Sequence, residues 1–298
     1  MTAAAIAALL LTGLAACGGD DGGAEGGLSD ALGAVSASPA AEQSFAFTDL
    51  SAVREVAEVP TPGEPFDPSF RRWLVPATLG APAITQNLMS IEGGQDVDLY
   101  GAERFVTIGF GGDGATRIDG FQGDSAPLTG LLDASTAEGD TVVIADEEAA
   151  RDAALGDGDE RLGDRAEYAA AADCLGDVLA AQISPAQQVG VPADAGKLVA
   201  VGVRGGDEPA DVLCVVGDGD QAERSEQALR SALDPDAVSR ATNRHISDEV
   251  EDVAFATGGD GDHRWARVIT TPHADSQMGY LYRSVYQMML ARSWYGSS

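Results

Sequence analysis

Short apolar runs rich in β-branched and aromatic residues predict strands through the second two thirds of the chain. Runs of this length, bounded by Gly, Asp or Pro, are typical of strands rather than of long helices. Residues 104–110 and 116–121 flank the turn Gly111-Gly112-Asp113-Gly114, which indicates a β-hairpin. The same pattern predicts further strands at 141–145, 211–216 and 265–271.

Apolar residues at three- and four-residue spacing predict helices between these strands. The clearest amphipathic pattern covers 164–181, and a last helix is expected over 276–294 with Met278, Leu281 and Tyr282 on its apolar face. Acidic or hydroxyl residues suited to a helix N-terminus precede the other helical segments. These helices are expected at 49–59, 124–137, 146–154 and 220–233.

Two segments of the chain resemble each other. Residues 104–113 (RFVTIGFGGD) line up with residues 197–207 (KLVAVGVRGGD), and a return strand and an acid-capped helix follow each. One interpretation is a strand–turn–strand–helix unit used twice, and the other is a chance likeness between two glycine-turn hairpins. Both predict an α+β fold of antiparallel hairpins with helices packed on the sheet. A duplication would divide the body into halves at 45–160 and 161–298.

The N-terminus carries an export pattern. The apolar run from Ala3 to Leu14 is too short to span a bilayer, and it ends in small residues. Leu14-Ala15-Ala16-Cys17 resembles the lipobox of bacterial lipoproteins, in which the cysteine becomes the diacylated first residue of the mature chain. The resemblance implies a signal peptide over 1–16, lipid (palmitate) attachment at Cys17, and a place on the extracytoplasmic face of the cell membrane.

The residues after Cys17 are rich in Gly, Ala, Ser and acids, which predicts a flexible acidic tether over 17–44 and a folded body over 45–298. In this overall plan the chain resembles surface lipoproteins of actinobacteria and related prokaryotes. No Lys or Arg precedes Arg54, so the basic region of a signal peptide is missing. Either the true start codon lies upstream, or the positive charge comes from the initiator amine alone. The alternative is an Ala-rich, poorly ordered N-terminus of a cytoplasmic protein.

The charge balance excludes some partners. The chain has 48 acidic and 18 basic residues and a net charge of −30, and Lys197 is the only lysine. A field of this sign repels nucleic acid and anionic lipid headgroups, so binding to either is not expected. An acidic, lysine-poor composition is typical both of halophilic and of GC-rich prokaryotes, and the sequence does not separate the two.

The cysteine count agrees with export. Once Cys17 carries lipid, Cys174 and Cys214 remain as an even pair, which predicts a disulfide in an oxidising compartment. The alternative is a pair of buried free thiols, which are common in protein cores.

One constellation has the residue types of a hydrolase. Gly123-Asp124-Ser125 and the later Asp260-Gly261-Asp262-His263 resemble the nucleophile and Asp-x-x-His blocks of the GDSL hydrolases, with Ser125 as nucleophile and His263 as base. The chain departs from that family because no Leu follows Ser125 and no Gly-x-Asn-Asp block is present. The alternative is a helix cap at Ser125 and a polar turn before His263.

The sequence patterns that could indicate a metal site are weaker than those of the hydrolase blocks. Three Asp-Gly-Asp segments begin like calcium loops, but Arg161, Ala222 and Arg264 stand where a third oxygen ligand is needed. The three histidines lack the spacing of zinc ligands. The sequence therefore predicts no metal site and no cofactor.

These observations predict a non-catalytic, lipid-anchored extracytoplasmic protein that acts by binding a protein or small-molecule partner not identified by the sequence. One alternative is a solute-binding lipoprotein of a transporter, which would have two βαβ lobes with parallel sheets. The second is an exported serine hydrolase that uses Ser125 and His263.

Overall fold

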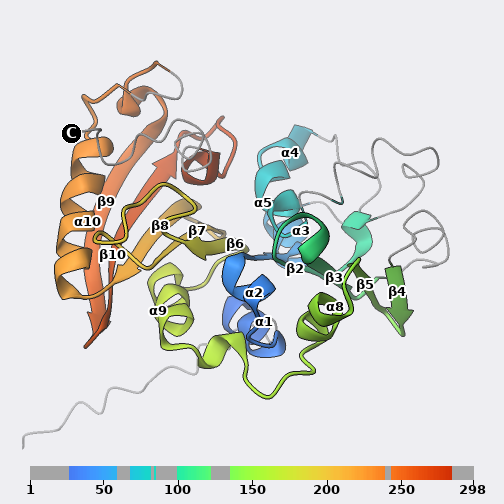
Figure 1. Ribbon diagram of the computed structural model, residues 1–298. Coiled ribbons are helices and arrows are strands. Elements are labelled where there is room, and N and C mark those ends of the chain that lie inside the picture. The colour runs from blue at the N-terminus through green and yellow to red at the C-terminus, as the bar shows by residue number, and fades with distance from the viewer. Residues whose placement is uncertain are drawn as a thin grey trace, which may run out of the picture.

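The fold is one antiparallel sheet of ten strands covered by helices, in the order β4-β5-β3-β2-β1-β6-β7-β8-β10-β9 (Figure 1). The computed structural model describes residues 27–58, 68–81, 84, 99–121, 135–238 and 243–283. Cys17, Ser125 and most of the expected helix at 276–294 lie outside these residues, although the chain is helical from Tyr280 to Arg283. The antiparallel pairing confirms the predicted α+β class.

The strand order contains the same arrangement twice. The N-terminal half holds β1 (Phe45–Asp49), β2 (Arg104–Ile108), β3 (Ala115–Asp119), β4 (Ser135–Glu138) and β5 (Thr141–Ala145). The C-terminal half holds β6 (Ala180–Pro185), β7 (Leu198–Arg204), β8 (Ala210–Gly217), β9 (Val250–Asp260) and β10 (His263–Pro272). Because β1 pairs with β6, each half runs outward as first, second, third, fifth and fourth strand. The repeated segments found in the sequence, 104–113 and 197–207, hold the second strand of each half and the turn after it, and the return strand that follows each is the third strand.

Helices cover both faces of this sheet. They are α1 (Leu28–Ala34), α2 (Pro39–Gln43), α3 (Leu50–Val56), α4 (Pro68–Arg71), α5 (Leu74–Leu79), α8 (Glu148–Leu155), α9 (Ala166–Leu175) and α10 (Gly219–Ala232). Single 3₁₀ turns lie at Leu99–Gly101, Gly111–Asp113, Leu162–Asp164 and Ile246–Asp248. Figure 1 shows α1, α2, α8 and α9 below the sheet, with α3 to α5 above its N-terminal half and α10 against its C-terminal half.

Side chains alternate between these two layers along each strand, as the pleat requires. On β7, Leu198 and Ala200 join the apolar cluster between the sheet and α1, α2, α8 and α9. Val199 and Val201 join the cluster between the sheet and α10. Phe105 of β2 packs with α3, α4 and α5. Burial on both faces explains why the central strands are continuous apolar runs.

The expectation of a flexible tether over 17–44 is wrong for Leu28–Gln43. These residues form α1 and α2, and Leu28, Ala31 and Leu32 of α1 are buried against the sheet. Their spacing of three and four residues is the pattern of one helix face, which the high Gly and Ala content obscured. The folded body therefore includes Leu28–Gln43, ahead of the expected start at Phe45.

Two predicted helices extend over residues that the structure shows in another conformation. The helix expected over 164–181 stops at Leu175, because Gly176 adopts a positive φ of 67° and reverses the chain; residues 180–181 begin β6. The helix expected over 124–137 is a strand at 135–137, which belongs to β4. By contrast α3 and α10 lie within or close to their predicted bounds, and Asp49 caps α3 at the backbone N–H of Ala52.

Candidate functional site

The two cysteines of the body form a disulfide between α9 and β8. Cys174 and Cys214 have Cα atoms 6.2 Å apart, and both side chains are fully buried. The bond forms where α9 lies across the lower face of the C-terminal half of the sheet, so a pair 40 residues apart in sequence meets without distortion of the core. The predicted disulfide is confirmed.

Two arginines of the sheet reach the end of α9 beside this bond. Arg204 of β7 donates from Nε to the carbonyl of Leu175 at 3.0 Å, and Arg267 of β10 donates to the carbonyl of Cys174 at 3.1 Å. Positive guanidinium groups suit the C-terminal end of a helix, where carbonyl groups lack helical partners. Burial, with Arg267 nearby, lowers the pKa of Arg204. The cluster fixes α9 to the sheet.

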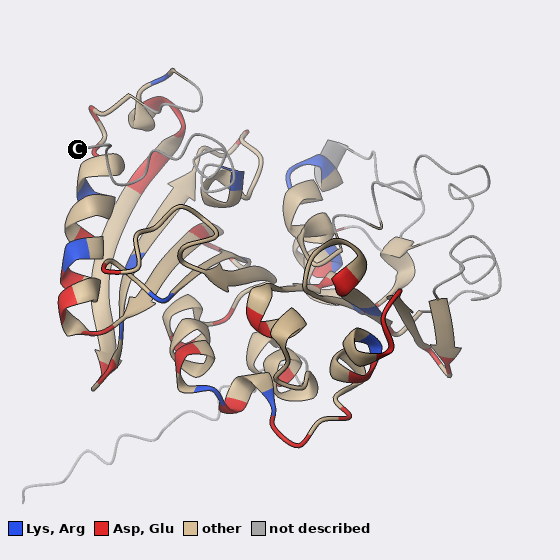
Figure 2. Cartoon of the chain, viewed as in Figure 1, with Lys and Arg blue, Asp and Glu red and all other residues tan. Residues whose placement is uncertain are grey.

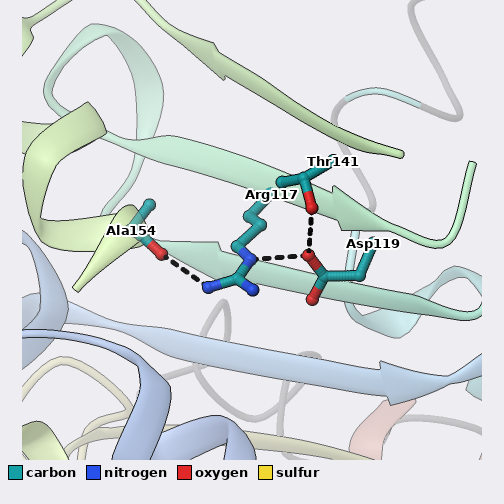
Figure 3. Close-up of polar contacts among 4 residues, drawn as sticks. All are labelled: Arg117, Asp119, Thr141 and Ala154. Carbon is teal, nitrogen blue, oxygen red and sulfur yellow. Dashed lines mark hydrogen bonds and ion pairs between the residues drawn. The ribbon is translucent and has the colours of Figure 1, made fainter. Parts of the chain in front are cut away.

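A related cluster lies in the N-terminal half (Figure 3). Arg117 of β3 donates from Nε to Asp119 at 2.6 Å and from Nη1 to the carbonyl of Ala154 near the end of α8 at 3.4 Å. The Thr141 hydroxyl donates to the same Asp119 oxygen at 3.2 Å. The Arg117 and Asp119 side chains are about four-fifths buried, with 22% and 17% exposed. Since each group already has a partner inside the cluster, its geometry suits a tie between sheet and helix.

Asp211 is the most unusual ionisable residue in the described part of the chain. It lies fully buried in β8, and its carboxylate accepts backbone N–H groups of Gly279 at 2.8 Å and Leu281 at 3.3 Å. Burial raises the pKa of Asp211 to about 6, although these N–H groups, that of Tyr280 and the charge of Arg283 act in the opposite direction. The carboxylate therefore holds the start of the C-terminal helical segment onto the sheet. Sequence analysis missed it, although an acid inside an apolar strand was the available signal.

The structure describes only one of the two residues proposed for a hydrolase, His263. His263 pairs with Asp260 across the β9–β10 turn, and its Nδ1 is buried without a hydrogen-bond partner. Ser125 lies outside the described residues, and Phe121 is the last described residue before it. Phe121 follows β3, which lies six positions from β10 in the strand order. Figure 1 shows these strands on opposite sides of the molecule.

The other histidines make contacts to the main chain or to a single acid. His245 Nδ1 lies 3.1 Å from the carbonyl oxygen of Asp236, and His273 Nδ1 lies 3.5 Å from Glu251. Across the described ranges, no group of three His, Cys, Asp or Glu side chains could hold a metal ion.

The Asp-Gly-Asp segments serve as caps and turns where the structure describes them. Asp218 accepts the backbone N–H of Gln221 at 2.8 Å, and the Gln221 side chain returns a bond to the backbone N–H of Asp218, which makes a capping box at the start of α10. Asp260 is the last residue of β9, and Asp262 lies in the β9–β10 turn. These positions are typical of structural turn residues.

Comparison of the chain with protein-family models, curated proteins and solved structures finds no match to any of them. The described helices include none with the length and apolar character needed to cross a membrane. The function is therefore argued from the residues and the fold.

Proposed function

We propose that this protein is a lipid-anchored extracytoplasmic protein that acts by binding a partner. The observation that carries the proposal is the buried Cys174–Cys214 disulfide, because disulfides form and persist in oxidising compartments. The lipobox-like Leu14-Ala15-Ala16-Cys17 supplies the export signal and the anchor. Dual acylation of Cys17 buries enough methylene groups for stable attachment.

The early start of the fold keeps the body close to its anchor. Only residues 18–27 separate Cys17 from α1, and a fully extended chain of this length spans about 35 Å. The layer formed by α1, α2, α8 and α9 is then the one nearest the membrane. The loop between α8 and α9 in this layer is acidic, so contact with anionic headgroups is unfavourable and the body stands off the surface (Figure 2).

Binding is favoured over catalysis because the buried charged groups already serve the fold. Arg117, Arg204 and Arg267 bond helix carbonyls, and Asp211 bonds backbone N–H groups. A transporter's solute-binding protein would have two lobes with parallel sheets, whereas the described strands form one continuous antiparallel sheet.

The strand order also speaks against a Ser125–His263 pair. Six strand spacings of about 4.8 Å separate β3 from β10 across the sheet. The chain from Phe121 to Ser125 reaches at most about 14 Å, which is about half of that separation. A serine and its base need to approach within about 3 Å, so this reach is too short for the pair.

The anchor is tested by metabolic labelling with radioactive palmitate in a bacterial host. Wild type is expected to incorporate label and to fractionate with membranes, and Cys17→Ala is expected to lose both, because only the Cys17 thiol can carry the lipid. Asp20→Asn is the matched control in the same segment and is expected to behave as wild type. Label that persists in Cys17→Ala, or an unlabelled wild type in the soluble fraction, contradicts the anchor.

A further inference from the structure

The outermost strand of the C-terminal half presents a long edge. β9 has 11 residues and pairs with β10 along its length, and no other described strand pairs with its outer side. The opposite edge of the sheet is β4, which has only 4 residues. A short strand is one of the ways in which proteins protect a sheet edge from further pairing, and β9 does not use it.

Half of the backbone groups of β9 point to this edge. In an antiparallel ladder, alternate residues direct both N–H and C=O to the same neighbouring strand. The hairpin closes on the pair Asp260–His263, so the even-numbered residues of β9 bond β10. The odd-numbered residues Val253, Phe255 and Thr257 therefore direct their backbone groups outward.

The middle of this edge also lacks the side chains that block pairing. Residues 253–259 (VAFATGG) contain no charged residue and no proline, although Lys, charged side chains and proline are the usual protection of an edge strand. Phe255 is partly buried, with the Arg230 guanidinium 4.6 Å from its ring centre. A strand added beside β9 would find this supported aromatic ring as a cross-strand neighbour.

Acidic residues flank the uncharged stretch at both ends. Glu251 and Asp252 precede it, and Asp260 and Asp262 follow it, and all four are exposed, with Glu251 lying 3.5 Å from His273. Two copies paired edge to edge in antiparallel register would bring Glu251 and Asp252 of one near Asp260 of the other. Like charges opposite one another destabilise a pair of strands, and each chain carries a net charge of −30. The charge thus disfavours a second copy as the occupant.

We propose that the outer edge of β9 accepts an extended segment of a partner polypeptide, apolar in its middle and basic at both ends, as an added antiparallel or parallel strand. Main-chain hydrogen bonds to the odd-numbered residues supply the affinity, and the acidic ends select the basic flanks. This inference rests on the binding part of the proposed function and is independent of the lipid anchor.

The test measures binding of a fluorescein-labelled peptide, Lys-Lys-Val-Thr-Val-Tyr-Val-Lys-Lys, to the full chain in detergent by fluorescence anisotropy. We expect binding that weakens at least tenfold when the lysines are replaced by glutamates. Peptides of the same charge are N-methylated at alternate residues, along one edge or along the other. Their binding is also expected to weaken at least tenfold, because a methylated edge cannot complete the ladder. N-methylated peptides that bind as tightly as the unmethylated peptide would overturn the proposal, since this would show attraction by charge alone.

Variants locate the binding on β9. Thr257→Pro removes an outward N–H, which an edge strand tolerates, and is expected to weaken binding tenfold or more. Since proline could still disturb the fold, the double variant Asp252→Asn/Asp260→Asn leaves the backbone intact and is expected to weaken binding several-fold. Its matched control is Asp207→Asn/Glu208→Gln, which removes two exposed charges from the β7–β8 turn and is expected to bind as wild type. Equal losses in both double variants would contradict a site on β9.

Sedimentation of the unliganded chain distinguishes a partner polypeptide from a second copy of the chain as the occupant of the edge. A monomer agrees with the proposal, whereas a dimer abolished by Thr257→Pro would assign the edge to a second copy and overturn it. Palmitate labelling of Cys17 is a separate readout, so loss of peptide binding and loss of the anchor are distinguishable.

Discussion

Single arginine side chains determine much of how this molecule is held together. Arg54 donates to the carbonyls of Tyr100 and Ala102 at 2.6 Å, and Arg224 donates to that of Asp194. Arg117, Arg204 and Arg267 do the same at the ends of helices. A guanidinium group offers several donors in a fixed plane and remains charged when partly buried, whereas an ammonium group does neither as well. This physical role suits a chain that has 17 arginines and a single lysine.

The capping residues Asp49 and Asp218 were predictable because a helix N-terminus needs a local acceptor. The role of Asp211 was not, because its partners Gly279 and Leu281 are distant in sequence and meet it only in the folded chain. Likewise, no local signal indicates which helix end Arg204 or Arg267 will reach.

Asp211 makes stability depend on pH. Its pKa is raised from 3.8 to about 6, so the folded chain binds the proton more tightly than the unfolded chain. The stabilisation is present in full below pH 4 and is lost as the pH rises through 6, by about 3 kcal/mol. Asn does not titrate, so the unfolding free energy of wild type minus that of Asp211→Asn should fall by this order between pH 4 and pH 7. Urea unfolding at each pH measures it.

The same substitution at exposed Asp207 controls for the change in overall charge and should give a difference that varies little over this range. A difference between wild type and Asp211→Asn that stays constant, or that grows with pH, would refute the raised pKa of the buried carboxyl.

At the scale of elements, the sequence predicts the apolar strands of the hairpins but misses both edge strands, β4 and β9, and the two strands at the centre of the sheet. The strand at 141–145 has the observed bounds of β5, and those at 211–216 and 265–271 lie inside β8 and β10. The strands β1 and β6, which join the halves, were missed: β1 is only 5 residues long, and β6 begins with Ala180 and Ala181, which favour helix. Their conformation comes from pairing on both sides, which is a tertiary effect.

The disulfide ties one such element, α9, to the sheet, and its removal should be costly. Closing a loop of 40 residues stabilises by roughly 3–4 kcal/mol in the chain-entropy model. Cys174→Ala/Cys214→Ala should therefore lower the free energy of unfolding in urea by about this amount. Dithiothreitol should produce a loss of similar size in wild type and none in the double variant. Equal stability of the variant and the oxidised wild type would show that the bond contributes nothing.

At the scale of the whole molecule, charge opposes folding. Figure 2 shows acidic residues over the turns, the helix ends and the loop below α8, with basic residues scattered among them. With a net charge of −30, the compact state brings these carboxylates together, whereas the unfolded chain separates them. The same field keeps copies apart in solution, which is consistent with an edge strand that carries no charge in its middle.

Added salt should therefore raise the melting temperature. Ions screen repulsion beyond about 10 Å at 0.1 M, and the repulsion is summed over many unpaired acids. Salt also weakens ion pairs such as Arg230–Glu226 and Arg165–Glu160, but exposed pairs contribute only about 0–1 kcal/mol each. Repulsion should win, so calorimetry should show the melting temperature rising from low salt to 0.5 M. Sodium and potassium chloride should act alike if screening is the cause. A flat or falling melting temperature would mean that the ion pairs, rather than the net charge, dominate the electrostatics of the fold.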